Sequence, residues 1–282
     1  LIRQLYSETK LTLEQGGEAL NRENRMAEAK KILREKLANW DPKDIKLETG
    51  RHYPPYWQGF QIGAQFAFAK LLKSLGADEI KIDLTPDTDR DATRICFALS
   101  DHPGIFSRLS GALALVGANV VDARSYTSKD GFATAAFWVQ DSDGAPYDQS
   151  RFSRLRAMIE KTLSGEIITR DAIKERDKLK KRERAFKVPT SITFNNDGSE
   201  IYTIIEVDTR DRPGLLFDLT RTLANMNVYI ASAVIATYGE QVVDSFYVKD
   251  MFGLKFYSES KQKKLEQNLR QAITLGVERA QS

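Results

Sequence analysis

Two short stretches of this 282-residue chain carry the residue types that can bind a small charged molecule. They are Asp101-His102-Pro103-Gly104 and Asp211-Arg212-Pro213-Gly214, and each leads into an apolar run typical of a helix. The carboxylate can accept hydrogen bonds from backbone N–H groups, as a helix N-cap does. The glycine lets backbone or ligand approach closely. The helix that follows directs unpaired N–H groups and a partial positive charge to the same place.

These groups together favour a zwitterion, and a free amino acid fits that description. An α-carboxylate suits the amides of a helix N-terminus, and an ammonium group suits Asp101 or Asp211. A helix entry without a ligand would explain either stretch taken alone. The repetition of the pattern favours the binding interpretation.

The two stretches head two copies of one structural unit, because their matching letters lie 110 residues apart and the match extends well beyond them. Each copy is predicted to contain a leading strand, a second strand that ends at the motif, a helix, a hairpin and a last helix. This order predicts an α+β fold with two ferredoxin-like βαββαβ domains, each with an additional leading strand at about 79–85 or 189–195.

The last strand of each βαββαβ domain is weak in the sequence. Residues 166–170 are a candidate in the first copy, and the second copy has no clear equivalent. The leading strand is the alternative occupant of that sheet edge, within its own copy or by exchange between copies. Sequence leaves the choice open.

The rest of the chain divides around these copies. Residues 1–76 are predicted to be a helical segment, interrupted at 41–44 and 51–57 by prolines and ending at Gly76 as a C-cap. We expect the two domains at 79–169 and 188–282, with a charged helical connector at 170–187.

Composition argues against several classes of function. No apolar run approaches the roughly 20 residues of a membrane span, so we expect a soluble, cytoplasmic protein with no membrane partner. The single cysteine, Cys96, allows no intrachain disulfide and favours a reducing compartment. A net charge of +3 gives little reason to expect nucleic acid. His52 and His102 stand in no metal-ligand pattern, and we assign no catalytic and no metal-binding residue.

Ferredoxin-like sheets also bind RNA, and residues 129–137 faintly resemble the aromatic ribonucleoprotein motif. That motif needs a basic residue before its glycine and aromatic rings at alternate positions. Here Asp130 precedes Gly131, and alanines replace the rings. RNA binding is therefore the weaker alternative.

Residues 211–248 resemble an ACT domain, a βαββαβ regulatory module that binds small metabolites, most often amino acids, between paired domains. Residues 101–139 resemble a second ACT domain. Together with the helical segment, including 1–10 and 51–57, they resemble the C-terminal part of the bifunctional PII uridylyltransferase/uridylyl-removing enzymes in their alphaproteobacterial form.

The resemblance implies a regulatory region that senses L-glutamine or another amino acid through paired ACT domains, within or between chains. Binding would shift the parent enzyme from uridylylating the PII signal protein towards removing the uridylyl group. This segment has no catalytic motif and no cofactor of its own. UTP and Mg²⁺ are implied for the parent enzyme. The alternative is a non-catalytic dimerisation module with empty sites.

The ligand-binding residues implied by the resemblance form two loops, each with one residue on a facing strand. They are Asp101, Gly104, Ile105 and Phe106 with Asn119, and Asp211, Gly214, Leu215 and Leu216 with Tyr229. Tyr229 occupies in the second copy the place of Asn119 in the first. The resemblance therefore predicts two sites of unequal affinity.

Overall fold

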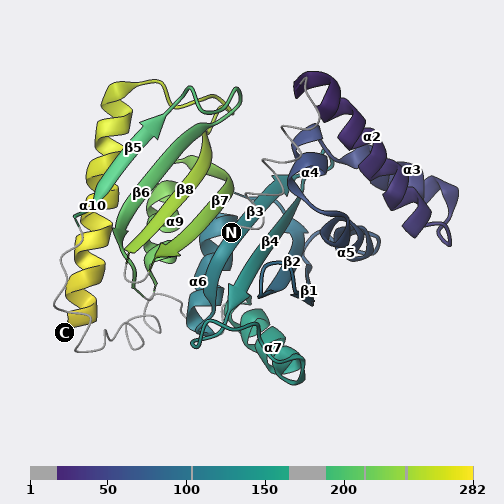
Figure 1. Ribbon diagram of the computed structural model, residues 1–282, viewed down its shortest axis with the longest axis horizontal. Coiled ribbons are helices and arrows are strands. Elements are labelled where there is room, and N and C mark those ends of the chain that lie inside the picture. Colours follow the sequence, from purple (N-terminus) through teal and green to yellow (C-terminus); the bar gives the residue numbers. More distant parts are fainter. Residues whose placement is uncertain (1–17, 103, 165–188, 213, 239–240, 282) are drawn as a thin grey trace. The chain divides into compact units, whose positions relative to one another are not determined.

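The computed structural model describes residues 18–102, 104–164, 189–212, 214–238 and 241–281 (Figure 1). The N-terminal segment forms helices α2 (Glu18–Lys36), α3 (Pro42–Arg51), α4 (Pro54–Gly59) and α5 (Ile62–Leu72). The first repeat forms β1 (Ile80–Asp87), β2 (Ala92–Ser100), α6 (Ile105–Leu115), β3 (Asn119–Thr127), β4 (Phe132–Gln140), the 3₁₀ turn η1 (Gln149–Arg151) and α7 (Phe152–Leu163). The second forms β5 (Ser191–Asn195), β6 (Thr203–Arg210), α9 (Leu215–Asn225), β7 (Val228–Tyr238), β8 (Gln241–Asp250) and α10 (Glu259–Gln281).

The chain forms two compact units. One contains the helical segment up to Asp83 together with Cys96–Asp101 and Tyr126–Thr134, and the other contains the remainder. Strands of the first repeat contribute residues to both units. The predicted domain boundaries remain predictions. Within the described ranges, no helix combines the length and the apolar character that a membrane span requires.

The α+β fold is confirmed. Within the described residues the strands form an eight-stranded sheet in the order β1-β2-β4-β3-β7-β8-β6-β5. The leading strand β5 pairs antiparallel with β6 of its own repeat, with Ile192 opposite Val207. The leading strand thus occupies the sheet edge that the sequence left open. The candidate strand at 166–170 and the connector at 170–187 lie outside the described residues.

The two repeats join through β3 and β7, and the joint is symmetric. Ala123 pairs with Ala233, its counterpart 110 residues later, and the register on either side is Asp122 with Val234 and Arg124 with Ser232. On the helix layer, Ser110 Oγ lies 3.0 Å from Thr220 Oγ1, again a residue and its counterpart. Residues that meet their own counterparts mark a pseudo-twofold axis between the repeats. The paired arrangement expected of ACT domains is therefore present within one chain.

The 110-residue offset changes to 109 in the second arm of the hairpin. Tyr147 N donates to Thr93 Oγ1 at 2.9 Å, and Phe256 N donates to Thr203 Oγ1 at 2.7 Å. These equivalent bonds pair Tyr147 with Phe256, which are 109 residues apart. Strand β8 is therefore displaced by one residue relative to the expected match, and Asp244 corresponds to the buried Ala135.

The helical segment differs from expectation at its breaks and at its end. Pro42 and Pro54 begin α3 and α4, because a proline at the first helical position gives up no hydrogen bond. Helix α5 ends at Leu72 with Lys73 as C-cap, so Gly76 is not the cap. The Gly76 N–H donates to Glu79 Oε2 at 3.0 Å instead.

Aromatic side chains form the core of the first unit. Phe60 lies 4.8 Å from Phe68 and 5.1 Å from Tyr126 of β3, measured between ring centroids. Tyr56 is 1% exposed and contacts all three rings. The end of α4 therefore packs directly on the β3–β4 hairpin.

In the second unit, helices α9 and α10 lie together on one face of strands β5–β8 (Figure 1). Alternate residues of β8 point into this layer, including Phe246 and Val248, which are fully buried. In the first repeat Phe106 of α6 meets Phe137 of β4 at 5.1 Å between ring centroids. The Phe106–Phe137 contact holds the start of α6 against β4.

Candidate functional site

A glycine with a positive φ angle precedes each motif helix. Gly104 (φ +82°) lies at the start of α6, and Gly214 (φ +73°) lies at the start of α9. A residue with a Cβ atom is strained in this left-handed region. A Cβ atom on Gly104 would also lie 3.7 Å from Ala224 Cβ of the second repeat. The glycine therefore sets the turn.

The motif aspartates do not cap the helices, which corrects the expected N-cap role. Gly104 and Gly214 occupy the N-cap positions, and neither helix has a side-chain cap. A carboxylate three residues earlier is outside the position from which a cap reaches the second or third helical amide. The Asp101 carboxylate accepts from Thr127 Oγ1 at 2.6 Å, and its backbone N–H donates to Gly131 O at 2.9 Å. Asp101 thus holds the end of β2 against the β3–β4 hairpin.

Replacement of Gly104 by alanine tests the strained turn. We expect Gly104→Ala to lower the free energy of unfolding by about 1–2 kcal/mol, because a Cβ atom is unfavourable at this φ angle. Gly50→Ala is the matched control: Gly50 lies in helix α3 with nothing within 4 Å of an added Cβ. It should raise the free energy of unfolding by about 0.5–1 kcal/mol. Urea unfolding measures both, and an equal change in the two variants would contradict the assignment.

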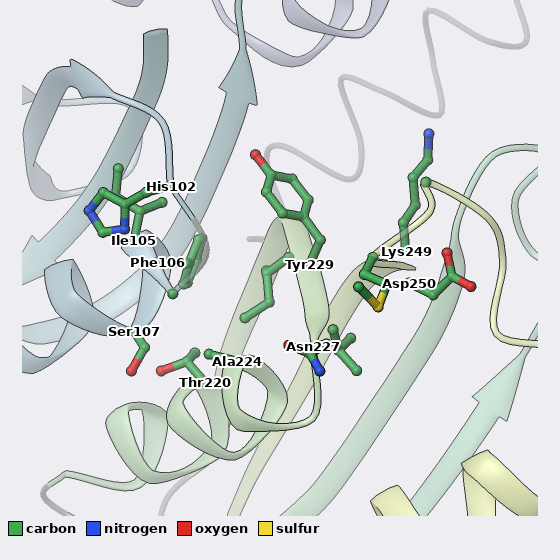
Figure 2. Close-up of a pocket in the computed structure, with 15 residues that line it drawn as sticks. His102, Ile105, Phe106, Ser107, Thr220, Ala224, Asn227, Tyr229, Lys249 and Asp250 are labelled. Atoms are coloured by element: carbon green, nitrogen blue, oxygen red, sulfur yellow. The ribbon is translucent and has the colours of Figure 1, made fainter. Parts of the chain in front are cut away.

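The first motif loop lines a cavity of about 490 Å³, within the size range of small-molecule sites. The first repeat contributes the start of α6, and the second contributes residues of α9, the start of β7 and the end of β8 (Figure 2). The lining residues are His102, Gly104, Ile105, Phe106, Ser107, Thr220, Ala224, Asn227, Val228, Tyr229, Ile230, Lys249, Asp250, Met251 and Gly253.

The cavity combines the predicted residues differently from expectation. Gly104, Ile105 and Phe106 line it as one group, but the strand residue with them is Tyr229, and Asn119 is not among the lining residues. Because the repeats are related by a pseudo-twofold axis, the loop of one repeat faces β7 of the other. The cavity thus places Tyr229 beside the first loop, and the expected pairing of that loop with Asn119 remains a prediction.

Five predicted residues besides Asn119 do not line this cavity. They are Asp101, Asp211, Gly214, Leu215 and Leu216. Leu215 is 2% exposed in the core at the start of α9. Their predicted roles in ligand binding remain predictions.

The cavity has polar groups at opposite sides and apolar walls between them. The amides of Phe106 and Ser107 belong to the first turn of α6, where an α-helix supplies no acceptor. Lys249 and Asp250 lie at the end of β8, and Tyr229 stands between them and the loop in Figure 2. Ile105 and Ile230 contribute apolar surface. This arrangement can take a small molecule that carries charges and a short apolar stem.

Asn227 is a lining residue that the sequence analysis missed. It follows α9 with φ +56°, at the position that glycine usually takes after a helix, and Gly117 holds the same position after α6 with φ +75°. Its side-chain amide is the difference between the two repeats at this turn. The sequence could have pointed to Asn227, because an asparagine there replaces the glycine that the first repeat has at the equivalent position. Lys249 gave no such signal, because a lysine at a strand end is common.

The second motif loop is held by an ion pair with the helix that follows it. Arg212 is 6% exposed, and its guanidinium lies 2.5 Å from Asp218 Oδ2 of α9. Arg279 of α10 lies 2.7 Å from the same oxygen. A Cβ atom on Gly276 would collide with the Arg212 guanidinium, so that glycine makes room for the arginine. In the first repeat His102 and Arg108 hold the positions of Arg212 and Asp218, and the ion pair does not exist there.

A second acidic group is buried near the second motif. Asp244 of β8 is 1% exposed, and its Oδ1 atom has no hydrogen-bond partner in the described part of the chain. Burial raises the pKa of Asp244 well above its ordinary value, and the negative charge of Asp211 adds to the effect. A carboxyl group in these surroundings is held in its neutral form.

Comparison with known proteins agrees with the fold of the second repeat. Residues 191–278 match a family model described as "ACR9-like, ACT-like domain". The second repeat is therefore an ACT-like domain, and the first repeats its order of elements. The class that fold and loops define is a tandem of ACT-like domains behind a helical segment.

The relatives are more specific. The chain is 67% identical over 280 residues to the bifunctional uridylyltransferase/uridylyl-removing enzyme of Cereibacter sphaeroides, and 66% identical over 286 residues to that of Ruegeria pomeroyi. It is 38% identical over 278 residues to the enzyme of Azospirillum brasilense. These alignments cover 99%, 99% and 97% of this chain but only 30%, 31% and 30% of the relatives. The chain belongs to this family, corresponds to its C-terminal region, and spans about a third of the relatives' length.

Proposed function

We propose that this region is the amino-acid sensor of a PII uridylyltransferase/uridylyl-removing enzyme and that its ligand is L-glutamine. The observation that carries the proposal is the cavity shared by the first motif loop and the second repeat. A ligand there touches both repeats at once. Binding can therefore favour one packing of the repeats over another, which is the physical requirement for a sensor.

The charges around the cavity fit an α-amino acid. The first-turn amides of α6 or the Lys249 ammonium group can bind an α-carboxylate, because both supply positive potential. Asp250 is the carboxylate among the lining residues and suits the ammonium group, a role that the sequence analysis gave to Asp101 or Asp211. The Asn227 amide can exchange hydrogen bonds with a side-chain amide such as that of glutamine.

The regulatory consequence concerns the complete enzyme. In this proposal, bound L-glutamine shifts the enzyme from uridylylating PII towards removing the uridylyl group. UTP and Mg²⁺ act in the parts of the enzyme beyond this chain, and the reaction takes place in the cytoplasm. The family membership and the tandem ACT-like domains support this assignment.

Calorimetric titration of this chain tests the proposal. We expect L-glutamine to bind at about one site per chain, and D-glutamine to release little heat because its ammonium and side chain exchange places. One site is expected because the second loop is engaged by Arg212, Asp218 and Arg279. The absence of saturable binding with L-glutamine, L-glutamate or other amino acids would favour a dimerisation module with empty sites.

A pair of asparagine variants locates the site. Asn227→Gly removes a lining amide and keeps a residue that tolerates the positive φ angle, as Gly117 does in the first repeat. We expect it to weaken L-glutamine binding about tenfold, the usual loss for one hydrogen bond of 1–1.5 kcal/mol. Asn119→Gly is the matched control and should leave the affinity unchanged. A larger loss for Asn119→Gly would support the pairing inferred from sequence.

A further inference from the structure

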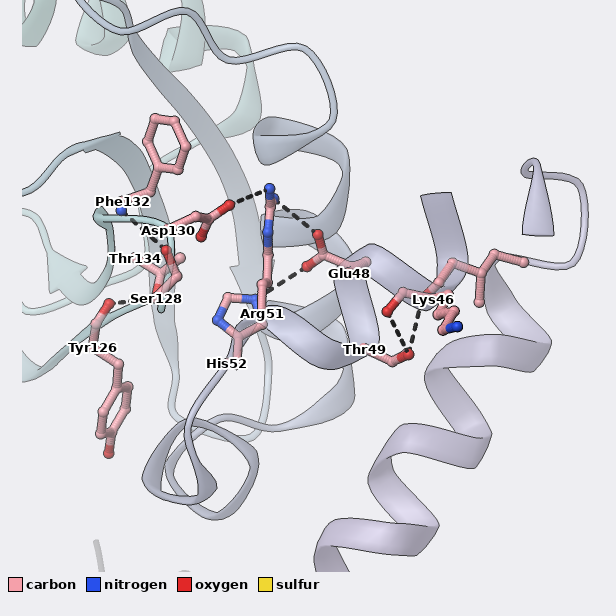
Figure 3. Close-up of polar contacts among 11 residues, drawn as sticks. Lys46, Glu48, Thr49, Arg51, His52, Tyr126, Ser128, Asp130, Phe132 and Thr134 are labelled. Atoms are coloured by element: carbon pink, nitrogen blue, oxygen red, sulfur yellow. Dashed lines mark hydrogen bonds and ion pairs between the residues drawn. The ribbon is translucent and has the colours of Figure 1, made fainter. Parts of the chain in front are cut away.

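A polar cluster joins the end of helix α3 to the turn between β3 and β4, with buried residues on the helix side and an exposed aspartate on the turn. It consists of Glu48, Arg51, His52 and Asp130, and it is called the Arg51 cluster below. Arg51 donates to Glu48 Oε2 at 3.1 Å and to Asp130 Oδ2 at 2.7 Å (Figure 3). Glu48 and Arg51 are 2% and 9% exposed. One guanidinium thus connects a carboxylate of its own helix with a carboxylate of the turn.

His52 completes the cluster from the other side of Glu48. Its Nε2 atom lies 3.1 Å from Glu48 Oε1, and its ring stacks on Tyr56 at 3.6 Å between centroids. Burial lowers the pKa of His52, although the hydrogen bond to Glu48 opposes the shift. A neutral imidazole leaves Arg51 as the positive charge between two carboxylates. Loss of the contact with Asp130 therefore leaves the buried guanidinium with Glu48 as its carboxylate partner in this cluster.

The main chain strengthens the same connection. Lys129 N donates to Arg51 O at 2.8 Å, and Lys129 Nζ donates to Gly50 O at 2.8 Å. The turn itself is closed by Ser128, whose Oγ accepts from Phe132 N at 3.0 Å. Main-chain and side-chain hydrogen bonds therefore connect the end of α3 to the β3–β4 turn.

The other side of this turn holds the aspartate of the first motif. Gly131 O accepts the hydrogen bond of Asp101 N at 2.9 Å, and Thr127 Oγ1 donates to the Asp101 carboxylate at 2.6 Å. Asp130 and Gly131 are neighbours in the chain, so the turn contacts α3 through one residue and the motif through the next. His102, which lines the cavity, follows Asp101 directly in the chain, and Gly104, which also lines it, stands three positions after Asp101.

The second repeat has a different sequence at this place. Gly239-Glu240 stand where the first repeat has Asp130-Gly131, and the helical segment occurs once in the chain. The connection is therefore particular to the repeat whose loop lines the cavity.

We propose that Arg51 and Asp130 are positioning residues for the first motif loop, and that they couple occupancy of the cavity to the end of helix α3. The proposal rests on the amino-acid binding proposed above. Any shift of Asp101 on binding acts on Gly131, and through the turn on Arg51. The coupling is reciprocal. If binding makes opening of the turn less favourable by some factor, opening of the turn weakens binding in the cavity by the same factor.

The decisive variant is Asp130→Asn, which keeps the size of the side chain and removes the charge that pairs with Arg51. Without ligand, we expect its Asp101 amide to exchange hydrogen about tenfold faster than in the wild type, because the turn opens more often. With L-glutamine, we expect a loss of affinity of about fivefold or more in calorimetry. In the wild type, L-glutamine should slow exchange at Asp101 and at Lys129. In the variant the effect at Lys129 should disappear.

Asp44→Asn is the matched control, because Asp44 lies on the same helix in an exposed ion pair with Lys73 at 3.3 Å. It should behave as the wild type in both measurements. Arg51→Lys serves as a second variant and should show the same changes as Asp130→Asn, since an ammonium group cannot make both contacts of the guanidinium fork.

The ligand-free exchange rate separates the two proposals. If the wild type binds no L-glutamine but Asp130→Asn speeds exchange at Asp101, the sensor proposal fails and the positioning role stands. An unchanged Asp101 amide in a folded Asp130→Asn protein overturns the positioning role. Normal affinity in that variant, or an L-glutamine effect that never reaches Lys129, overturns the coupling.

Discussion

Replacing Arg212 by methionine should lower the free energy of unfolding by about 3–5 kcal/mol, the usual cost of breaking a buried ion pair from one side. Arg212 is almost wholly buried and lies 2.5 Å from Asp218, which is itself 8% exposed. Methionine has a similar length and fills the space beside Gly276. The loss of stability would therefore measure the cost of leaving the buried Asp218 carboxylate with one fewer positive partner.

The second arginine of this group provides the control. Arg279 contacts the same Asp218 oxygen at 2.7 Å, but its side chain is 31% exposed. Water can replace much of its contribution, and Arg279→Met should lower the free energy of unfolding by about 1 kcal/mol. Urea unfolding with equal m-values gives both numbers. Equal losses for the two arginines would show that burial does not set the cost.

Asp244→Asn should stabilise the protein at neutral and alkaline pH and remove part of its pH dependence. Burial raises the pKa of Asp244 in the folded chain above the value of the unfolded chain. Between those two values the folded state holds a proton that the unfolded state has lost. The wild type therefore loses stability as pH rises through this window, by up to about 1.4 kcal/mol per pH unit.

The measurement is urea unfolding of the wild type and Asp244→Asn at a series of pH values that begins below the ordinary aspartate value of 3.8 and extends into the alkaline range. Below the ordinary aspartate value of 3.8 the two proteins should be similar, because both carry a neutral side chain there. Asp197→Asn, in the exposed turn after β5, is the control and should keep the wild-type slope. If Asp244→Asn also keeps the wild-type slope, the carboxyl group is not held neutral.

The order of elements could be predicted from local patterns. Strands and helices repeat their apolar spacing 110 residues apart, and that spacing depends on neighbours within a few positions. The turn glycines were equally accessible, because Gly104 and Gly214 stand where a chain enters a helix with a positive φ angle. Local signals of this kind predicted the order of strands and helices correctly in both repeats.

The site could not be predicted from the same signals, because it depends on how the units meet. Asn119 and Tyr229 hold equivalent places in the sequence, and only the antiparallel pairing of β3 with β7 shows that Tyr229 lies at the first loop. The N-cap role of Asp101 was wrong for a local reason, since the glycine and not the aspartate occupies the cap position. The one-residue displacement of β8 was hidden by the hairpin turn.

The symmetric joint between the repeats has a consequence for how the two copies can diverge. On the axis, Ala123 pairs with Ala233 and Ser110 contacts Thr220. A substitution at one of these positions therefore changes the surroundings of the equivalent residue in the other copy. Away from the axis the counterparts do not meet, and the two copies differ: His102 and Arg108 in the first stand where Arg212 and Asp218 stand in the second. A duplicated domain can thus keep small matched residues along its central joint while its two loops differ, one lining a cavity and the other forming a buried ion pair.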